Sequence, residues 1–190
     1  NILVSDNNVY LAGHSKGGNL AMCAGMELRD VLRDKIRLIY NFDGPGFLKM
    51  EYEGKYGLIR DRLINVVPTG SVVGMCLYND NYRSVKSKDL AFSEHYPVGW
   101  GVFGEFFVKG TLSKVSKQIH EMTTSNLDMV DKKELGETLE ELCKGMGVDY
   151  DSDLHLSIGE LWEVLKNMKG IDPKVYKYLT SVMQTLMKVK

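Results

Sequence analysis

Short apolar runs, separated by turn-forming residues, recur through the first half of the chain. Their length and composition predict β-strands at residues 9–12, 36–42, 63–67, 72–78 and 82–87. Residues 17–33 are rich in small side chains that pack closely on a sheet, and they predict a helix. A strand, helix and strand in this order imply a parallel pair. The turn-rich segment 78–82 predicts a hairpin before the last strand.

The second half of the chain has a helical pattern. Apolar positions recur every three to four residues in four segments, which predict helices at 112–122, 131–145, 157–168 and 173–188. We interpret these apolar stripes as core contacts, because an amphipathic helix normally buries its apolar face. The expected organisation is therefore an α/β core over residues 1–110, followed by a helical region over residues 111–190 that packs on the core or is appended to it.

Residues 13–18 (GHSKGG) have the form G-x-S-x-G directly after the first apolar run, which predicts a nucleophile elbow. In such an elbow Ser15 occupies a sharp strand-to-helix turn, and we expect Gly13 and Gly17 to lie against each other where only small side chains fit. The turn would expose Ser15 Oγ above the strand ends. The backbone N–H of Lys16, at a helix N-terminus, is our candidate oxyanion donor.

Composition narrows the possible function classes. The chain has 190 residues, is 44% hydrophobic and carries a net charge of −1, so it lacks the excess of positive charge expected of a nucleic-acid-binding protein. No apolar run is long enough to span a bilayer. The cysteines Cys23, Cys76 and Cys143 are widely separated and show no C-x-x-C spacing. We therefore expect reduced thiols in a cytoplasmic protein.

One acidic segment resembles a calcium-binding loop. Asp149, Asp151, Asp153 and Glu160 fall at positions one, three, five and twelve of an EF-hand. Position six, where the loop needs glycine, is Leu154, and Ser157 with Glu160 forms a capping box that opens the next helix. We therefore expect neither a metal nor another cofactor.

Three segments carry a resemblance to a known superfamily. Residues 13–21, 41–47 and 67–75 (GHSKGGNLA, NFDGPGF and VPTGSVVGM) are similar to the lipase-like serine hydrolases of the α/β-hydrolase superfamily, and more narrowly to an uncharacterised bacterial family. The resemblance covers residues 8–105. It implies a partial α/β-hydrolase fold, a mostly parallel sheet flanked by helices, with a serine nucleophile and ester chemistry. Because such an elbow normally follows earlier strands, we expect the chain to be a processed product or a part of a longer polypeptide. Either an upstream segment supplies the second oxyanion donor, or the chain is an incomplete hydrolase.

The superfamily orders its triad as Ser, then Asp or Glu, then His. His95 is our candidate base because it follows the last predicted strand, although an ordinary loop histidine would look the same. His14 is adjacent to Ser15 and suits a packing role. His120 and His155 lie beyond the resemblance.

The acid is less well defined by the sequence. Relatives usually place a carboxylate after the strand at 63–67, but residues 68–71 (PTGS) contain none. Asp43, one strand earlier, is the best substitute, and it is equally well explained as a turn former. Asp80 is a third candidate, at a predicted hairpin tip.

Together these residues predict an enzyme that cleaves a small-molecule or lipid-like carboxylic ester through an acyl-enzyme intermediate. Two alternatives remain open: a non-catalytic binding or scaffold module of the same fold, and acyl transfer to an acceptor other than water. Neither the substrate nor the oligomeric state follows from the sequence.

Overall fold

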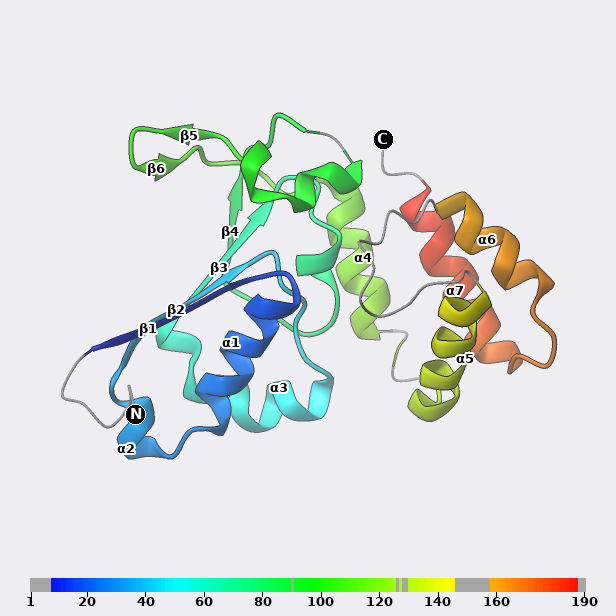
Figure 1. The fold of residues 1–190 in the computed structure, drawn as a ribbon, viewed down its shortest axis with the longest axis horizontal. Helices are drawn as coiled ribbons and strands as arrows, with labels where there is room; N and C mark the ends of the chain where they lie inside the picture. The colour runs from blue at the N-terminus through cyan, green and yellow to red at the C-terminus, as the bar shows by residue number, and fades with distance from the viewer. Residues whose placement is uncertain (1–7, 90, 126, 128–129, 146–157, 188–190) are drawn as a thin grey trace. The chain divides into compact units, whose positions relative to one another are not determined.

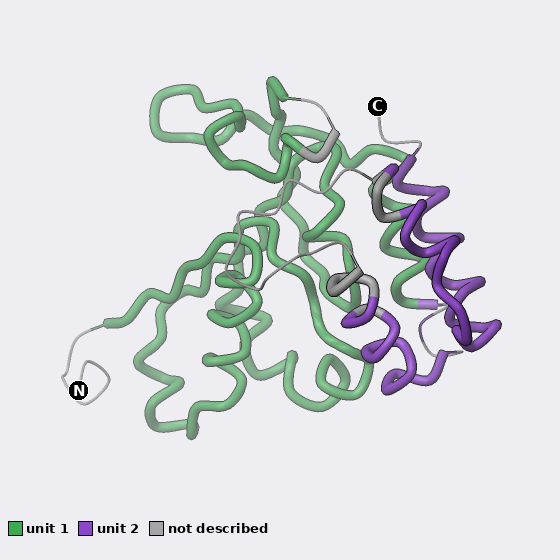
Figure 2. The backbone as a smooth tube through the Cα atoms, turned by 45° about the vertical axis from the view of Figure 1, so that its right-hand side comes forward, with its two compact units in different colours: residues 1–124 green, residues 125–190 purple. Residues whose placement is uncertain are grey.

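A computed structural model describes residues 8–89, 91–125, 127, 130–145 and 158–187. The chain divides into two compact units, Asn1–Thr124 and Ser125–Lys190 (Figure 2). The helix α4 (Lys114–Ser125) falls almost wholly within the first unit. The boundary between the units therefore lies after the first helix of the predicted helical region 111–190.

The first unit is built on a parallel sheet of four strands that lie side by side in chain order (Figure 1). The strands are β1 (Val9–His14), β2 (Ile36–Phe42), β3 (Leu63–Pro68) and β4 (Tyr82–Val85). The helices α1 (Lys16–Glu27) and α3 (Lys49–Lys55) lie on the same side of this sheet. The structure confirms the predicted mixed α/β class and the parallel pairing of β1 with β2.

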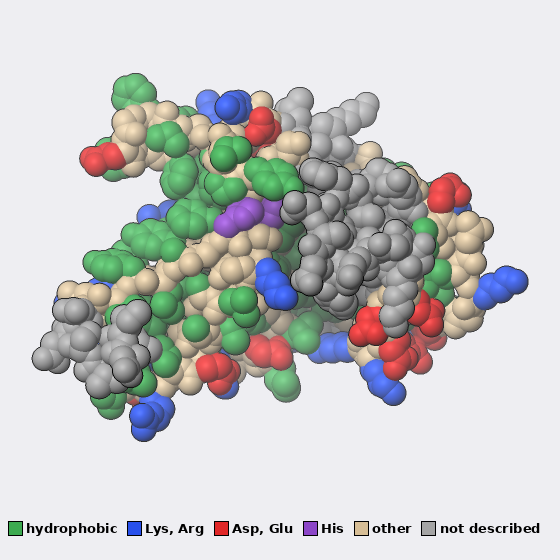
Figure 3. All heavy atoms as spheres, viewed as in Figure 1, with side chains coloured by type: hydrophobic (Ala, Val, Ile, Leu, Met, Phe, Trp, Pro, Cys, Tyr) green, Lys and Arg blue, Asp and Glu red, His purple; other side chains and the backbone are tan. Residues whose placement is uncertain are grey.

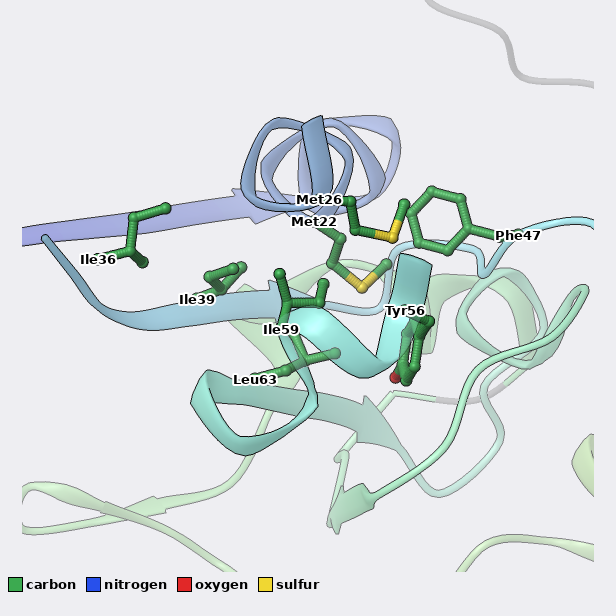
Figure 4. Packing of buried hydrophobic residues seen from close by; sticks show 8 residues of the cluster. All are labelled: Met22, Met26, Ile36, Ile39, Phe47, Tyr56, Ile59 and Leu63. Carbon is green, nitrogen blue, oxygen red and sulfur yellow. The ribbon is translucent and has the colours of Figure 1, made fainter. Parts of the chain in front are cut away.

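One hydrophobic core lies between the sheet and these helices (Figure 4). Met22 of α1 packs in one buried cluster with Ile39 of β2 and Tyr56, and all three side chains are fully buried. Two short 3₁₀ helices, η2 (Tyr56–Leu58) and η3 (Arg60–Arg62), lead from α3 into β3. Burial of these apolar side chains fixes α1, and with it the turn that precedes α1, against the sheet.

The predicted helix over 17–33 is divided in two. α1 ends at Glu27, and a single further turn forms α2 (Asp30–Arg33). The buried Arg33 side chain explains the break, because its guanidinium donates to the carbonyl oxygens of Gly25 and Leu28 at the end of α1. A cation that caps these carbonyls stabilises the helix terminus.

Two predictions around β4 are wrong. Residues 72–78 contain the 3₁₀ turn η4 (Val73–Met75) in place of a strand, so this segment cannot form a hairpin with β4. β4 pairs instead with β3, in parallel. Tyr78 forms an isolated antiparallel bridge with Phe47. The apolar residues of this segment are buried in an irregular connection, which periodicity alone does not distinguish from a strand.

The opposite face of the sheet is covered only in part. After β4 come the 3₁₀ turns η5 (Ala91–His95) and η6 (Pro97–Gly99), then an antiparallel hairpin of β5 (Val102–Phe103) and β6 (Phe106–Phe107). Trp100 is buried against Val66 and Val85 on this face. The hairpin projects beyond the sheet (Figure 1).

In the described part of the second unit lie the helices α5 (Lys132–Gly145), α6 (Ile158–Asn167) and α7 (Pro173–Leu186), close to the predicted bounds. Leu165 and Val175 are fully buried, as expected of core stripes. Asp172 begins α7, since its carboxylate accepts the N–H groups of Lys174 and Val175. Within the described residues, none of the helices combines the length and the apolar character needed to cross a membrane.

Candidate active site

Ser15 lies at the sharp turn between β1 and α1. Its backbone angles, φ 56° and ψ −130°, are rarely adopted by a residue with a side chain. Its N–H donates to the carbonyl oxygen of Phe42 at 2.9 Å, which continues the β1–β2 ladder into the turn. The elbow geometry predicted from residues 13–18 is therefore present, at the carboxyl end of the sheet.

The glycines around Ser15 have unequal roles. A Cβ atom on Gly13 would collide with the carbonyl group of Gly17, whereas a Cβ on Gly17 would meet no atom within 4 Å. A Cβ on Gly18 would instead collide with the side-chain oxygen of Asn41. Gly13 and Gly17 thus lie against each other as predicted, and the steric requirement for Gly13 is confirmed. The requirement predicted for Gly17 is wrong, because its own Cβ would meet open space and the second restriction on size falls at Gly18.

Asp43 and His95 form a hydrogen-bonded pair at the end of β2. His95 Nδ1 is 2.7 Å from Asp43 Oδ2, and the Asp43 side chain is fully buried. The second carboxylate oxygen accepts the Ser71 hydroxyl and, at 3.2 Å, the N–H of Gly74. Since a carboxylate only accepts hydrogen bonds, the contact places the proton of a neutral His95 on Nδ1 and leaves Nε2 unprotonated.

A buried amide holds the loop that carries Asp43. Asn41 Oδ1 accepts the N–H of Gly44 at 3.0 Å, and its Nδ2 donates to the Gly44 carbonyl at 3.1 Å and to Asn65 Oδ1 at 2.9 Å. From α1, Asn19 Nδ2 donates to the carbonyl oxygens of Pro45 and Gly46. The loop after β2 is thus fixed to both the sheet and the elbow helix.

Three contacts fix the turn that carries His95. Glu94 Oε2 accepts the N–H of Gly70 at 2.8 Å, and Trp100 Nε1 donates to the Glu94 carbonyl at 2.7 Å. His14 Nε2 donates to the His95 carbonyl at 2.8 Å, with the two rings 4.5 Å apart. Because His14 directly precedes Ser15, this bond ties the histidine turn to the elbow. On the face of the molecule drawn in Figure 3, histidine side chains reach the surface among hydrophobic ones.

Burial changes the acidity of two neighbouring groups. It raises the pKa of Glu94, with a smaller contribution from the Asp43 charge, while the Gly70 N–H acts in the opposite direction. Burial also raises the pKa of the Cys76 thiol to about 11. Cys23 and Cys76 are free thiols, and the side chain of Cys143 lies outside the described part of the chain.

The structure places the other candidates elsewhere. Asp80 accepts the Tyr52 hydroxyl at 3.0 Å and pairs with Arg60 at 2.6 Å, and so it belongs to a separate polar cluster. His120 Nδ1 bonds the carbonyl of Met75. His155, the loop 149–157 and the Glu160 side chain lie outside the described residues. No cluster of three metal-ligating side chains occurs within the described ranges.

Several residues in this site were not predicted from the sequence. Ser71 follows β3, at the place where a carboxylate was sought, and supports Asp43 through its hydroxyl. Glu94 and His14 anchor the His95 turn. A clue to Ser71 was its position in a loop at the end of a parallel strand, because such strand ends meet at one edge of the sheet.

The elbow geometry predicts opposite effects for two alanine substitutions. Gly13→Ala should destabilise the chain by several kcal/mol, about 3 or more, because the new Cβ meets backbone that cannot move independently. Gly17→Ala should leave stability unchanged or raise it by up to about 1 kcal/mol, as alanine favours helix. Urea denaturation of both variants and of the parent chain measures their free energies of unfolding. Equal stabilities would contradict the described packing.

The buried Glu94 carboxyl predicts a pH-dependent stability. A raised pKa in the folded state means that folding favours the protonated acid, so the free energy of unfolding should fall as pH rises above the ordinary value of 4.5. Glu94→Gln should flatten this fall, because an amide does not titrate. The amide oxygen still accepts the Gly70 N–H, so the turn is kept. Chemical denaturation from pH 4 to 7 measures the free energy of unfolding of the parent chain, of Glu94→Gln and of the exposed control Glu105→Gln. A Glu94→Gln curve parallel to the parent curve would refute the assignment.

Comparison with known proteins shows the family of the chain. A family model described as Mbeg1-like matches residues 2–144, which include the elbow, the Asp43–His95 pair and the whole sheet. No curated protein and no solved structure matches the chain. The match extends over most of the sequence, and the chain therefore belongs to the Mbeg1-like family, a family of unknown function.

Proposed function

We propose that this chain is a serine hydrolase of the α/β-hydrolase type, which cleaves a carboxylic ester through an acyl-enzyme. The observation that carries the proposal is the 2.7 Å contact between His95 Nδ1 and the buried Asp43 carboxylate. It is supported by the elbow geometry of Ser15, whose N–H bonds the carbonyl of Phe42, the residue before Asp43. A nucleophile, a base and an acid that orients the base are the groups that acyl transfer by serine requires.

The proposed reaction has two steps. His95 Nε2 accepts the proton of Ser15 as Oγ attacks the ester carbonyl carbon, and the protonated ring then gives this proton to the departing alcohol. Water attacks the resulting acyl-serine, His95 accepts a proton from it, and the carboxylic acid leaves as Ser15 recovers its hydrogen. Asp43 holds the ring and stabilises its positive charge throughout.

Lys16 is the proposed oxyanion donor through its backbone. It is the first residue of α1, where backbone N–H groups have no partner within the helix. The partial positive charge of the helix N-terminus favours an oxyanion at this point. The Lys16 side chain is exposed and has no part in this proposal.

Labelling with a fluorophosphonate tests the proposal. We expect covalent labelling of the parent chain, none of Ser15→Ala, and a rate lower by about 100-fold or more for His95→Ala, because the general base is lost. His120→Ala serves as the matched histidine control. Absence of labelling in a folded sample would reject the hydrolase and favour a non-catalytic module of the same fold.

Ser71 should act as a positioning residue for the acid. Ser71→Ala removes one charge-assisted hydrogen bond from a fully buried carboxylate, a loss of about 1.5–3 kcal/mol. We expect slower labelling at Ser15 together with lower stability, and partial recovery in Ser71→Thr, which keeps the hydroxyl. The exposed Ser93→Ala is the control. An unchanged labelling rate in Ser71→Ala would exclude this role.

A further inference from the structure

The incompletely covered face of the sheet contains a groove of about 930 Å³. Its floor is formed by Tyr40 and Phe42 of β2 and by Ile64 and Val66 of β3, and the β5–β6 hairpin forms one wall. The volume of the groove is within the range of sites that bind small molecules, and its apolar floor is typical of such sites. The groove lies wholly within the first unit.

Three cationic side chains line this apolar groove. The parallel register aligns Phe42, Val66 and Arg83, which places Arg83 on the same face as the apolar floor. Lys109 and Lys117 also line the groove, opposed by a single acidic side chain, Glu105.

The three groove cations have no acidic partner of their own among the described residues. Across the described ranges, the side chains of Arg83, Lys109 and Lys117 have neither a hydrogen bond nor an ion pair. Arg60 and Arg62 are paired, with Asp80 and Asp34, whereas Lys86, Lys88 and Lys114 are unpaired within these ranges like the groove cations but do not line the groove. The groove therefore offers net positive charge with unused donors.

The hairpin exposes an unusual amount of apolar surface near the groove. Phe103 is 84% exposed and Phe106 is 68% exposed, although both are large and apolar. Hydrophobic side chains gather over the hairpin and along the strands below it (Figure 3). Exposed apolar patches of this kind mark binding sites.

We infer that this groove binds a single-chain anionic amphiphile, with the chain on the apolar floor and the acidic head group at Arg83, Lys109 and Lys117. The apolar floor disfavours a fully polar ligand, because burial of polar groups without partners costs free energy. The excess of cations disfavours a cationic or neutral head group. Binding in the groove does not require the chemistry of Ser15, so the inference is tested independently of the proposed hydrolase activity.

Calorimetric titration with dodecyl phosphate below its micelle concentration tests the inference. We expect saturable binding at one site, weaker binding of a neutral dodecyl maltoside, and none of inorganic phosphate. Arg83→Gln combined with Lys109→Gln and Lys117→Gln should weaken dodecyl phosphate binding at least about tenfold, the size of one charge-assisted hydrogen bond. Ser15→Ala should bind like the parent.

Matched variants distinguish binding in the groove from non-specific electrostatic and hydrophobic binding. A control variant makes the same change of charge outside the groove, at Lys86, Lys88 and Lys114, each replaced by Gln. Its affinity for dodecyl phosphate should equal that of the parent chain. Phe106→Ser should weaken binding several-fold, whereas Phe103→Ser, its cross-strand partner outside the groove lining, should not. Thermal unfolding verifies that each variant is folded.

The inference is overturned by an absence of saturable binding, by equal affinity for dodecyl phosphate and dodecyl maltoside, or by equal losses of affinity in the two triple variants. Equal losses in Phe103→Ser and Phe106→Ser would assign the surface to adsorption on a lipid layer through the hairpin.

Discussion

The Asp43 carboxylate is the interaction on which the candidate site depends. It is fully buried at the end of β2, yet both of its oxygens have partners drawn from separate loops: His95 on one, and Ser71 with Gly74 on the other. A buried charge is tolerated only when it is bonded in this way. The same bonds that satisfy the carboxylate therefore join the loops after β2, β3 and β4.

This requirement explains the irregular segment after β3. Ser71 reaches Asp43 from a turn directly after β3, in which its N–H donates to the Pro68 carbonyl. Gly74 reaches Asp43 because the chain then turns through η4, and a strand across 72–78 would carry it away. The loop after β2 is held in turn by Asn41, which bonds both backbone groups of Gly44. Local backbone geometry around the site is thus set by side-chain hydrogen bonds, which outweigh the apolar pattern of the segment.

The two faces of the parallel sheet have different roles. On one face, α1 and the buried cluster around Met22 and Ile39 hold the elbow in its strained conformation. On the other, Phe42, Val66 and Arg83 share one register row beside the hairpin and form the groove. Successive residues of a strand point to opposite faces, so a single strand, β2, supplies both the elbow's support and the groove's floor.

The sequence by itself determined the strands β1 to β3, the helices of the second unit, the elbow at Ser15 and the need for glycine at residue 13. Each depends on neighbours a few residues apart, through periodicity and local steric limits. Only the tertiary structure decided that His95 meets Asp43, 52 residues away, and that His14 holds the His95 turn from 81 residues away. The shift of the glycine requirement from Gly17 to Gly18, the support from Ser71 and Glu94, and the unpaired cations of the groove also emerged only there. The physical reason is that hydrogen bonding and burial depend on distances in space, which packing sets and local sequence does not encode.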